Sequence, residues 1–184
     1  MAVLTGWPRK LAFFLPSGLV VLLVAGESTQ TFSIENTSRW LAPFWFRHFA
    51  SLPSQRFWEF NEALRKGGHL IGFGLVCLAF FTGWMPWVHR RSLAGSFNLS
   101  LSLKDGWVWR NRAAGLALLS TLLLAAGDEL HQRYVPQRTS TMTDVGFDVC
   151  GGYFALMILF AALRIREQRI ASQAPAEALE QAAG

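Results

Sequence analysis

Apolar residues are bunched into four stretches that polar segments separate. These stretches are residues 11–25, 67–88, 113–127 and 145–163. A helix needs about 20 residues to cross a bilayer, and the second and fourth stretches meet that length as they stand. The first and third are shorter, but tryptophan and basic residues border both, and long basic side chains can reach the headgroups from within a span. The pattern predicts four transmembrane helices, at about 7–25, 67–88, 113–130 and 145–163.

The first stretch has a second interpretation. Arg9 and Lys10 precede an apolar run that ends at Ala25-Gly26 before polar residues, which also describes a secretory signal peptide. We favour a retained helix, because an even number of spans fits the distribution of basic residues.

Composition supports a membrane protein. The 184 residues are 52% hydrophobic and 16% charged, whereas a typical soluble domain is about 25% charged. If the N-terminus is inside, ten of the 17 Lys and Arg residues lie on the inner side, and the other seven are spread over a longer outer segment. The positive-inside rule then predicts a multi-pass cell-membrane protein with both termini in the cytoplasm, so the basic balance reflects topology and predicts no nucleic-acid partner. Five tryptophans are expected in an aromatic belt at the inner boundary: Trp7, Trp84, Trp87, Trp107 and Trp109.

The outer segment, residues 26–66, is neither a span nor a plain loop. Its aromatic residues alternate with Arg39 and Arg47, Ser54 is a candidate helix cap, and Glu62 and Lys66 have the spacing of a helical ion pair. The pattern predicts one or two amphipathic helices on the outer leaflet, and a folded hairpin resting on the bundle is the alternative. The expected fold is therefore all-α, a four-helix transmembrane bundle with an amphipathic outer-leaflet segment between helices 1 and 2.

Residues 1–170 are expected to form one membrane domain. The tail, residues 171–184, is rich in Ala, Gln and Glu and has no apolar face, so we expect it to be disordered and cytoplasmic. Cys77 and Cys150 both fall within spans and are expected to be free thiols.

Polar residues that sit inside or at the lip of a span are costly and often mark function. Under this topology they gather at the outer ends of the second, third and fourth helices. The candidates are Lys66, His69, Asp128, Glu129, Gln132, Arg138, Ser140, Asp144 and Asp148.

Helical spacing indicates which of these can cooperate. Asp128 and Gln132 share one face of the third helix. Asp144 and Asp148 continue into a stripe of small residues, Gly151 and Ala155, which can pack closely against another helix. For Asp144 taken alone, a structural role is equally good, because a carboxylate in the first turn of a helix interacts favourably with the helix dipole. Gly68-x-x-x-Gly72 offers a second close-contact face.

The residue types indicate acid–base and phosphate chemistry. Glu129 or Asp128 with His69 are candidates for general acid and base, and Lys66 and Arg138 suit a phosphate or carboxylate. Gln132, Ser140, Asp144 and Asp148 are further candidate binding residues. A divalent cation bridged by Asp128, Asp144 and Asp148 would suit hard carboxylate ligands. No zinc-type spacing and no nucleophile elbow occurs, so no metal or cofactor is predicted and enzyme status stays open.

These motifs resemble the VanZ-like membrane proteins between Lys66 and Gly152. The motifs are Lys66-x-x-His69, Asp128-Glu129-x-x-Gln132-x-Tyr134-x-Pro136-x-Arg138 and Ser140-x-x-x-Asp144-x-x-x-Asp148-x-x-Gly151. Three positions depart from the family pattern: Phe73 where Tyr is frequent, Gln137 where Gly is common, and Asp148 where Asn is usual. The resemblance implies four membrane helices in the bacterial inner membrane and, in some members, resistance to glycopeptide antibiotics of the teicoplanin type. It implies no defined reaction.

Two functions fit the sequence. The first is binding or modification of an envelope lipid or a lipid-linked cell-wall precursor at the outer leaflet. The alternative is a non-enzymatic structural or partner-binding protein whose polar cluster is an interhelical salt-bridge network. An ion pathway fits less well, because the inner halves of the spans carry no polar steps.

Overall fold

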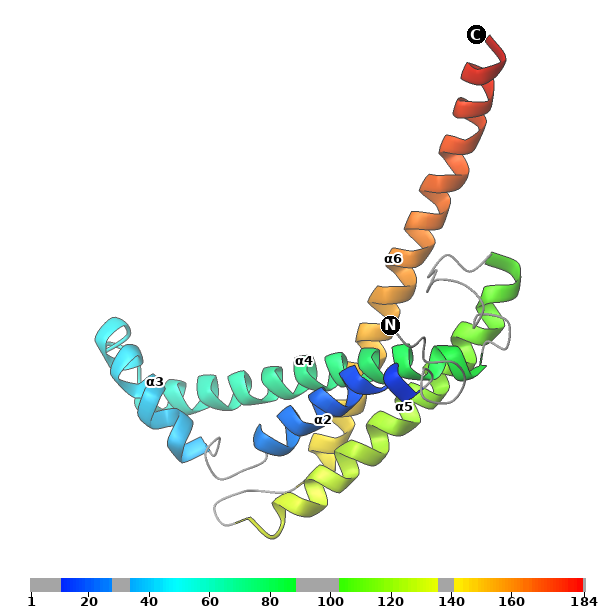
Figure 1. Cartoon of the computed structure of the whole chain (residues 1–184). Helices are drawn as coiled ribbons and strands as arrows, with labels where there is room; N and C mark the ends of the chain where they lie inside the picture. Colours follow the sequence, from blue (N-terminus) through cyan, green and yellow to red (C-terminus); the bar gives the residue numbers. More distant parts are fainter. Residues whose placement is uncertain (1–10, 28–33, 89–102, 136–140, 184) are drawn as a thin grey trace, which may run out of the picture.

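The computed structural model describes residues 11–27, 34–88, 103–135 and 141–183, and every regular element in them is an α-helix. The helices are α2 (Leu15–Glu27), α3 (Ile34–His48), α4 (Ser54–Val88), α5 (Leu103–Gln132) and α6 (Met142–Ala183) (Figure 1). Because no strand occurs in these described residues, the all-α class is confirmed.

Three of the helices are long and apolar enough to cross a membrane. The candidate spans are Ser54–Val88, Trp107–Gln132 and Met142–Gln173, and they contain the second, third and fourth predicted spans. The 13 residues of α2 rise about 20 Å at 1.5 Å per residue, which is less than the hydrocarbon core of about 30 Å. A turn at Phe13 and Phe14 precedes α2, so the predicted fourth crossing remains a prediction.

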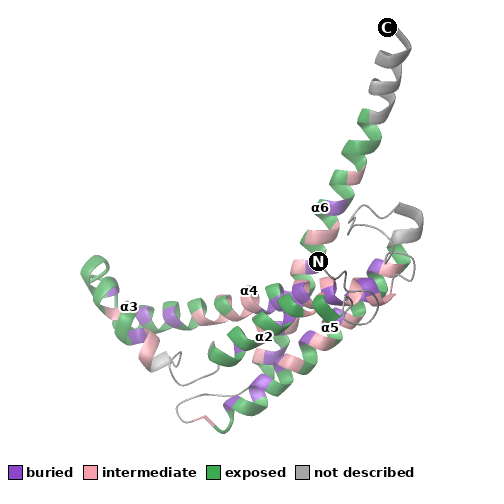
Figure 2. Cartoon of the chain, in the orientation of Figure 1, coloured by how far each residue is buried: buried purple, intermediate pink, exposed green. Residues whose placement is uncertain are grey.

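Contacts between the long helices fix their directions. His69 lies beside Asp148 and Phe81 beside Phe160, so α4 and α6 run the same way. Trp84, near the end of α4, donates to Ser120 in the middle of α5. Arg110, near the start of α5, pairs with Glu167, which lies well after Asp148 on α6. α5 is therefore antiparallel to α6. Most buried positions lie where α2, α4, α5 and α6 come together (Figure 2).

α4 and α6 approach each other closely at Gly74 and Gly151. A Cβ atom added to Gly151 would overlap the backbone carbonyl of Leu70, and one added to Gly74 would lie 3.2 Å from the carbonyl oxygen of Gly151. The same Gly74 position lies 3.4 Å from the Cβ of Ala155. The predicted stripe of small residues on α6 is therefore a close-contact face.

The prediction of a close-contact face at Gly68 and Gly72 is wrong. A Cβ added at either position would meet nothing within 4 Å. At about 100° per residue, Gly72 lies about 200° around α4 from Gly74, so it faces away from α6. Residue spacing identified a glycine face, but it was not the face that α6 contacts.

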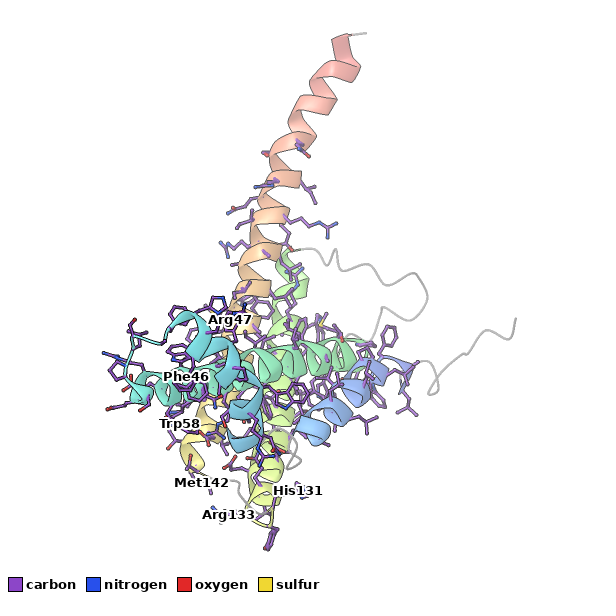
Figure 3. The ribbon with its side chains drawn as sticks, turned by 90° about the vertical axis from the view of Figure 1, so that its left-hand side faces the viewer. Phe46, Arg47, Trp58, His131, Arg133 and Met142 are labelled. Atoms are coloured by element: carbon purple, nitrogen blue, oxygen red, sulfur yellow. The ribbon has the colours of Figure 1, made fainter. Side chains whose placement is uncertain are left out.

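α3 and the first turns of α4, residues 54–64, form a hairpin held by aromatic contacts. The ring of Trp45 lies 5.0 Å from that of Phe60, and buried Phe57 packs between the two helices. Figure 3 shows Phe46, Arg47 and Trp58 gathered where these helices meet. The predicted pair of Glu62 and Lys66 is present at 2.7 Å. Contact of this hairpin with the outer leaflet remains a prediction.

Two helices extend beyond their expected limits. α4 begins at Ser54 and continues without a break through Gly67 and Gly68, because residues 62–66 just before these glycines are strong helix formers and residues 54–66 include no proline. α6 runs to Ala183 and projects away from the other helices (Figure 1), whereas we expected disorder after residue 170. Alanine, glutamate and glutamine favour helix even without an apolar face to bury.

The end of the bundle where α5 begins contains polar contacts that composition did not indicate. Arg110 pairs with Glu167 at 2.8 Å, and their side chains are only 6% and 17% exposed. The indole of Trp84 donates to the hydroxyl of Ser120 at 3.0 Å and meets the ring of Phe14 edge-on. Trp84 therefore packs between helices, because a partner for its N–H lies inside the bundle, and it differs from the expected belt residue.

Replacing Gly151 with alanine tests the close approach. We expect Gly151→Ala to lower the melting temperature in mild detergent by roughly 3–10 °C, because overpacking against backbone costs about 1–3 kcal/mol. Gly72→Ala is the matched control, since its added methyl group meets open space and alanine favours helix. Equal melting temperatures for the two variants would contradict the observed packing.

Candidate functional site

Polar side chains from three helices, most of them buried, meet where α5 ends and α6 begins. We call them the polar cluster: His69 on α4, Asp128, Glu129 and Gln132 on α5, and Asp148 on α6. The last four are between 1% and 9% exposed. Figure 3 shows His131, Arg133 and Met142 at this same end of the molecule. Sequence reasoning proposed all five members, and the structure brings them together.

A hydrogen bond between His69 and Asp148 joins α4 to α6. The Nδ1 atom of His69 lies 3.2 Å from an Oδ1 atom of Asp148, and the imidazole stacks on Phe73. A carboxylate on Nδ1 fixes the orientation of the ring and leaves Nε2 as the nitrogen that can exchange a proton with a ligand. The geometry therefore suits a histidine that acts on something bound beside it.

Asp128 and Gln132 are hydrogen-bonded on one face of α5. The side-chain amide of Gln132 donates to Oδ2 of Asp128 at 2.8 Å, which confirms the shared face that their spacing predicts. The charge of Asp128 also acts on His69 and on Asp148. The carboxylates of α5 and α6 thus lie in one electrostatic environment.

Glu129 connects the end of α5 to the start of α6. Its carboxylate accepts a hydrogen bond from the backbone N–H of Thr141, and the Thr141 hydroxyl accepts one from the N–H of Asp144 at 3.3 Å. Thr141 therefore caps α6, and Asp144 lies in the first turn as expected. Glu129 positions this cap, a contact that residue spacing did not reveal.

A small cleft opens between α4 and α6 next to the polar cluster. It is lined by Arg65, Lys66, His69, Asp144 and Phe147. The Nζ atom of Lys66 lies 5.8 Å from the centre of the Phe147 ring and pairs with Glu62 outside the cleft.

Sequence reasoning missed two residues of this cleft. Arg65 was counted only among the outer basic residues, and Phe147 was treated as part of an apolar span. The spacing of Arg65, four residues before His69, was the available signal, because it places both on one face of α4.

Two predicted binding residues, Arg138 and Ser140, lie outside the described residues. Among the positions that are described, no group of three or more His, Cys, Asp or Glu side chains is arranged to hold a metal ion. Asp128, Asp144 and Asp148 accordingly do not form a ligand set in this structure.

Comparison of the sequence with known protein families identifies its family. The family model described as VanZ/LLP1 matches residues 13–164. The chain belongs to the VanZ/LLP1 family. Its three long apolar helices agree with that assignment, so it is a VanZ-like membrane protein. Searches of curated proteins and of solved structures found no match.

Removing the amide of Gln132 tests the packing of this VanZ-like cluster. Gln132→Leu leaves buried Asp128 without one hydrogen bond, and we expect a loss of about 1–3 kcal/mol in unfolding free energy. The measurement is denaturant unfolding in mild detergent. His131→Leu, at the exposed neighbouring position, should change stability by less than about 0.5 kcal/mol. Equal losses for both variants would count against the hydrogen bond.

Proposed function

We propose that this VanZ-like protein binds an envelope lipid or a lipid-linked cell-wall precursor at the outer leaflet, through the polar cluster and the adjacent cleft. The proposal includes four spans in the cell membrane, an outer-leaflet position for the α3–α4 hairpin, and both termini in the cytoplasm. It also includes the link to glycopeptide resistance that some family members have.

One observation carries the proposal. Asp128, Glu129, Gln132 and Asp148 are nearly inaccessible to solvent and lie at one end of a bundle whose three long helices are apolar enough to cross a membrane. Burying charged groups in a membrane helix is costly, so such groups usually pair with each other or serve a ligand. Here they lie next to a cleft that also holds Arg65 and Lys66, and Arg and Lys side chains are the usual partners of phosphate.

The same groups have the chemistry that modification of a bound lipid requires. His69 lines the cleft and is oriented by Asp148. With Asp128 or Glu129, it would supply the general acid and base. Arg138 and Ser140, on the connection between α5 and α6, complete the proposed set of binding residues.

Lipid retention tests the binding proposal. Wild-type protein purified in mild detergent should carry an enriched lipid that mass spectrometry identifies. We expect Glu129→Gln and Arg138→Lys to lose that lipid and any glycopeptide tolerance, while their membrane levels stay normal. Arg56→Lys and Glu59→Gln, which alter an exposed pair at 3.1 Å, serve as controls and should keep the lipid. Wild-type preparations that carry no enriched lipid would overturn the proposal.

A second candidate function is a structural network. It is favoured by the hydrogen bonds that already join the cluster, from His69 to Asp148 and from Thr141 to Glu129. Removing one partner of a buried polar pair is strongly destabilising. If Glu129→Gln and Arg138→Lys disappear from the membrane while the control variants accumulate, the network becomes the better account.

Cysteine labelling tests the proposed topology. In a Cys150→Ser background, with buried Cys77 retained, Ser140→Cys should react with a membrane-impermeant maleimide on intact cells. Ser172→Cys, an exposed position late in α6, should react only after permeabilisation. The opposite pattern would reverse the orientation.

A further inference from the structure

The cleft between α4 and α6 is lined by two oppositely charged residues, Arg65 and Asp144, whose side chains form no hydrogen bond or ion pair with another described residue. Arg65 makes no hydrogen bond or ion pair there, and its Nε atom is buried without an acceptor. The carboxylate of Asp144 is likewise unpaired, since only its backbone N–H is bound, to Thr141. The other two charged or titratable residues of the cleft, Lys66 and His69, both have partners.

Arg65 and Asp144 line the same small cleft, yet they are not within ion-pair distance of each other. An unpaired charge next to an apolar helix bundle is costly. A zwitterionic ligand would provide an opposite charge for Arg65 and for Asp144 at the same time. A purely anionic ligand would satisfy Arg65 but would leave its own charge facing Asp144.

The side chains specify each half of such a ligand. A guanidinium group binds phosphate oxygens with a fixed fork of N–H donors. A carboxylate can accept hydrogen bonds from a primary ammonium, which a quaternary ammonium cannot donate.

We propose that this cleft binds the zwitterionic headgroup of an aminophospholipid, with its phosphate on Arg65 and its primary ammonium on Asp144. This inference rests on the proposed function, because it names the lipid class that the same site takes. The helices beyond the cleft suit the acyl chains, since Ile71 and Leu75 on α4 and Phe154 and Ile158 on α6 are exposed.

Lipid competition on the full-length protein tests the headgroup. Native mass spectrometry would measure retention of phosphatidylethanolamine, phosphatidylglycerol and phosphatidylcholine with matched acyl chains. We expect about tenfold stronger retention of phosphatidylethanolamine by wild-type protein, as one or two charge-assisted hydrogen bonds would give. Equal retention of the three lipids would overturn the inference.

Two variants separate the two halves of the site. Arg65→Gln should weaken all three lipids by about tenfold, because each has a phosphate. Asp144→Asn should weaken phosphatidylethanolamine alone and remove its preference over phosphatidylglycerol. Arg65→Lys, which keeps the charge without the fork, should fall between wild type and Arg65→Gln. Unchanged retention in Arg65→Gln and Asp144→Asn would overturn the assignment of these residues.

Controls keep these results interpretable. Arg56→Gln and Glu59→Gln change exposed charges at the start of α4 and should retain lipid as wild type does. Melting temperatures in the same detergent identify misfolded variants, and Arg65→Lys replaces Arg65→Gln if the latter does not fold. Wild-type protein that retains no lipid at all would end both proposals. Retention without preference for phosphatidylethanolamine would end only this one.

Discussion

The contact between Gly151 of α6 and the backbone of Leu70 in α4 determines the arrangement of the rest of the bundle. Because Gly151 has no side chain, the two helices approach more closely than any larger residue would allow. His69 precedes Leu70, and Asp148 lies nearly one turn before Gly151. The same approach therefore brings the imidazole and the carboxylate within hydrogen-bond distance, so the site geometry depends on backbone packing.

The sequence was sufficient for features that depend on local periodicity. It predicted the long apolar helices, the shared face of Asp128 and Gln132, and the ion pair between Glu62 and Lys66. It was insufficient for features that depend on which helix faces meet. His69 and Asp148 are 79 residues apart, and no spacing rule links them. The prediction of a close-contact face at Gly68 and Gly72 failed for the same reason. The position of Arg65 in a cleft likewise depends on where α6 lies.

The two ends of the bundle differ in whether their charged side chains form ion pairs. Where α5 begins, Arg110 and Glu167 form an ion pair at 2.8 Å, so each charge has an opposite charge beside it. At the other end, Arg65 and Asp144 line a cleft and form no ion pair with each other or with another described side chain. Half-buried charged side chains that line a cleft without pairing in this way are candidates for contact with a ligand.

Arg110–Glu167 and His69–Asp148 also limit how the protein can move. On α6, Asp148 and Glu167 are 19 residues apart (167 − 148), which is about 28 Å along the axis. Each binds a different neighbouring helix. A piston-like shift of α6 by one turn, about 5.4 Å, would break both bonds and move a larger residue into the place of Gly151. Sliding of α6 along its axis is therefore excluded while both bonds are intact, whereas tilting and side-chain rearrangement are compatible with them.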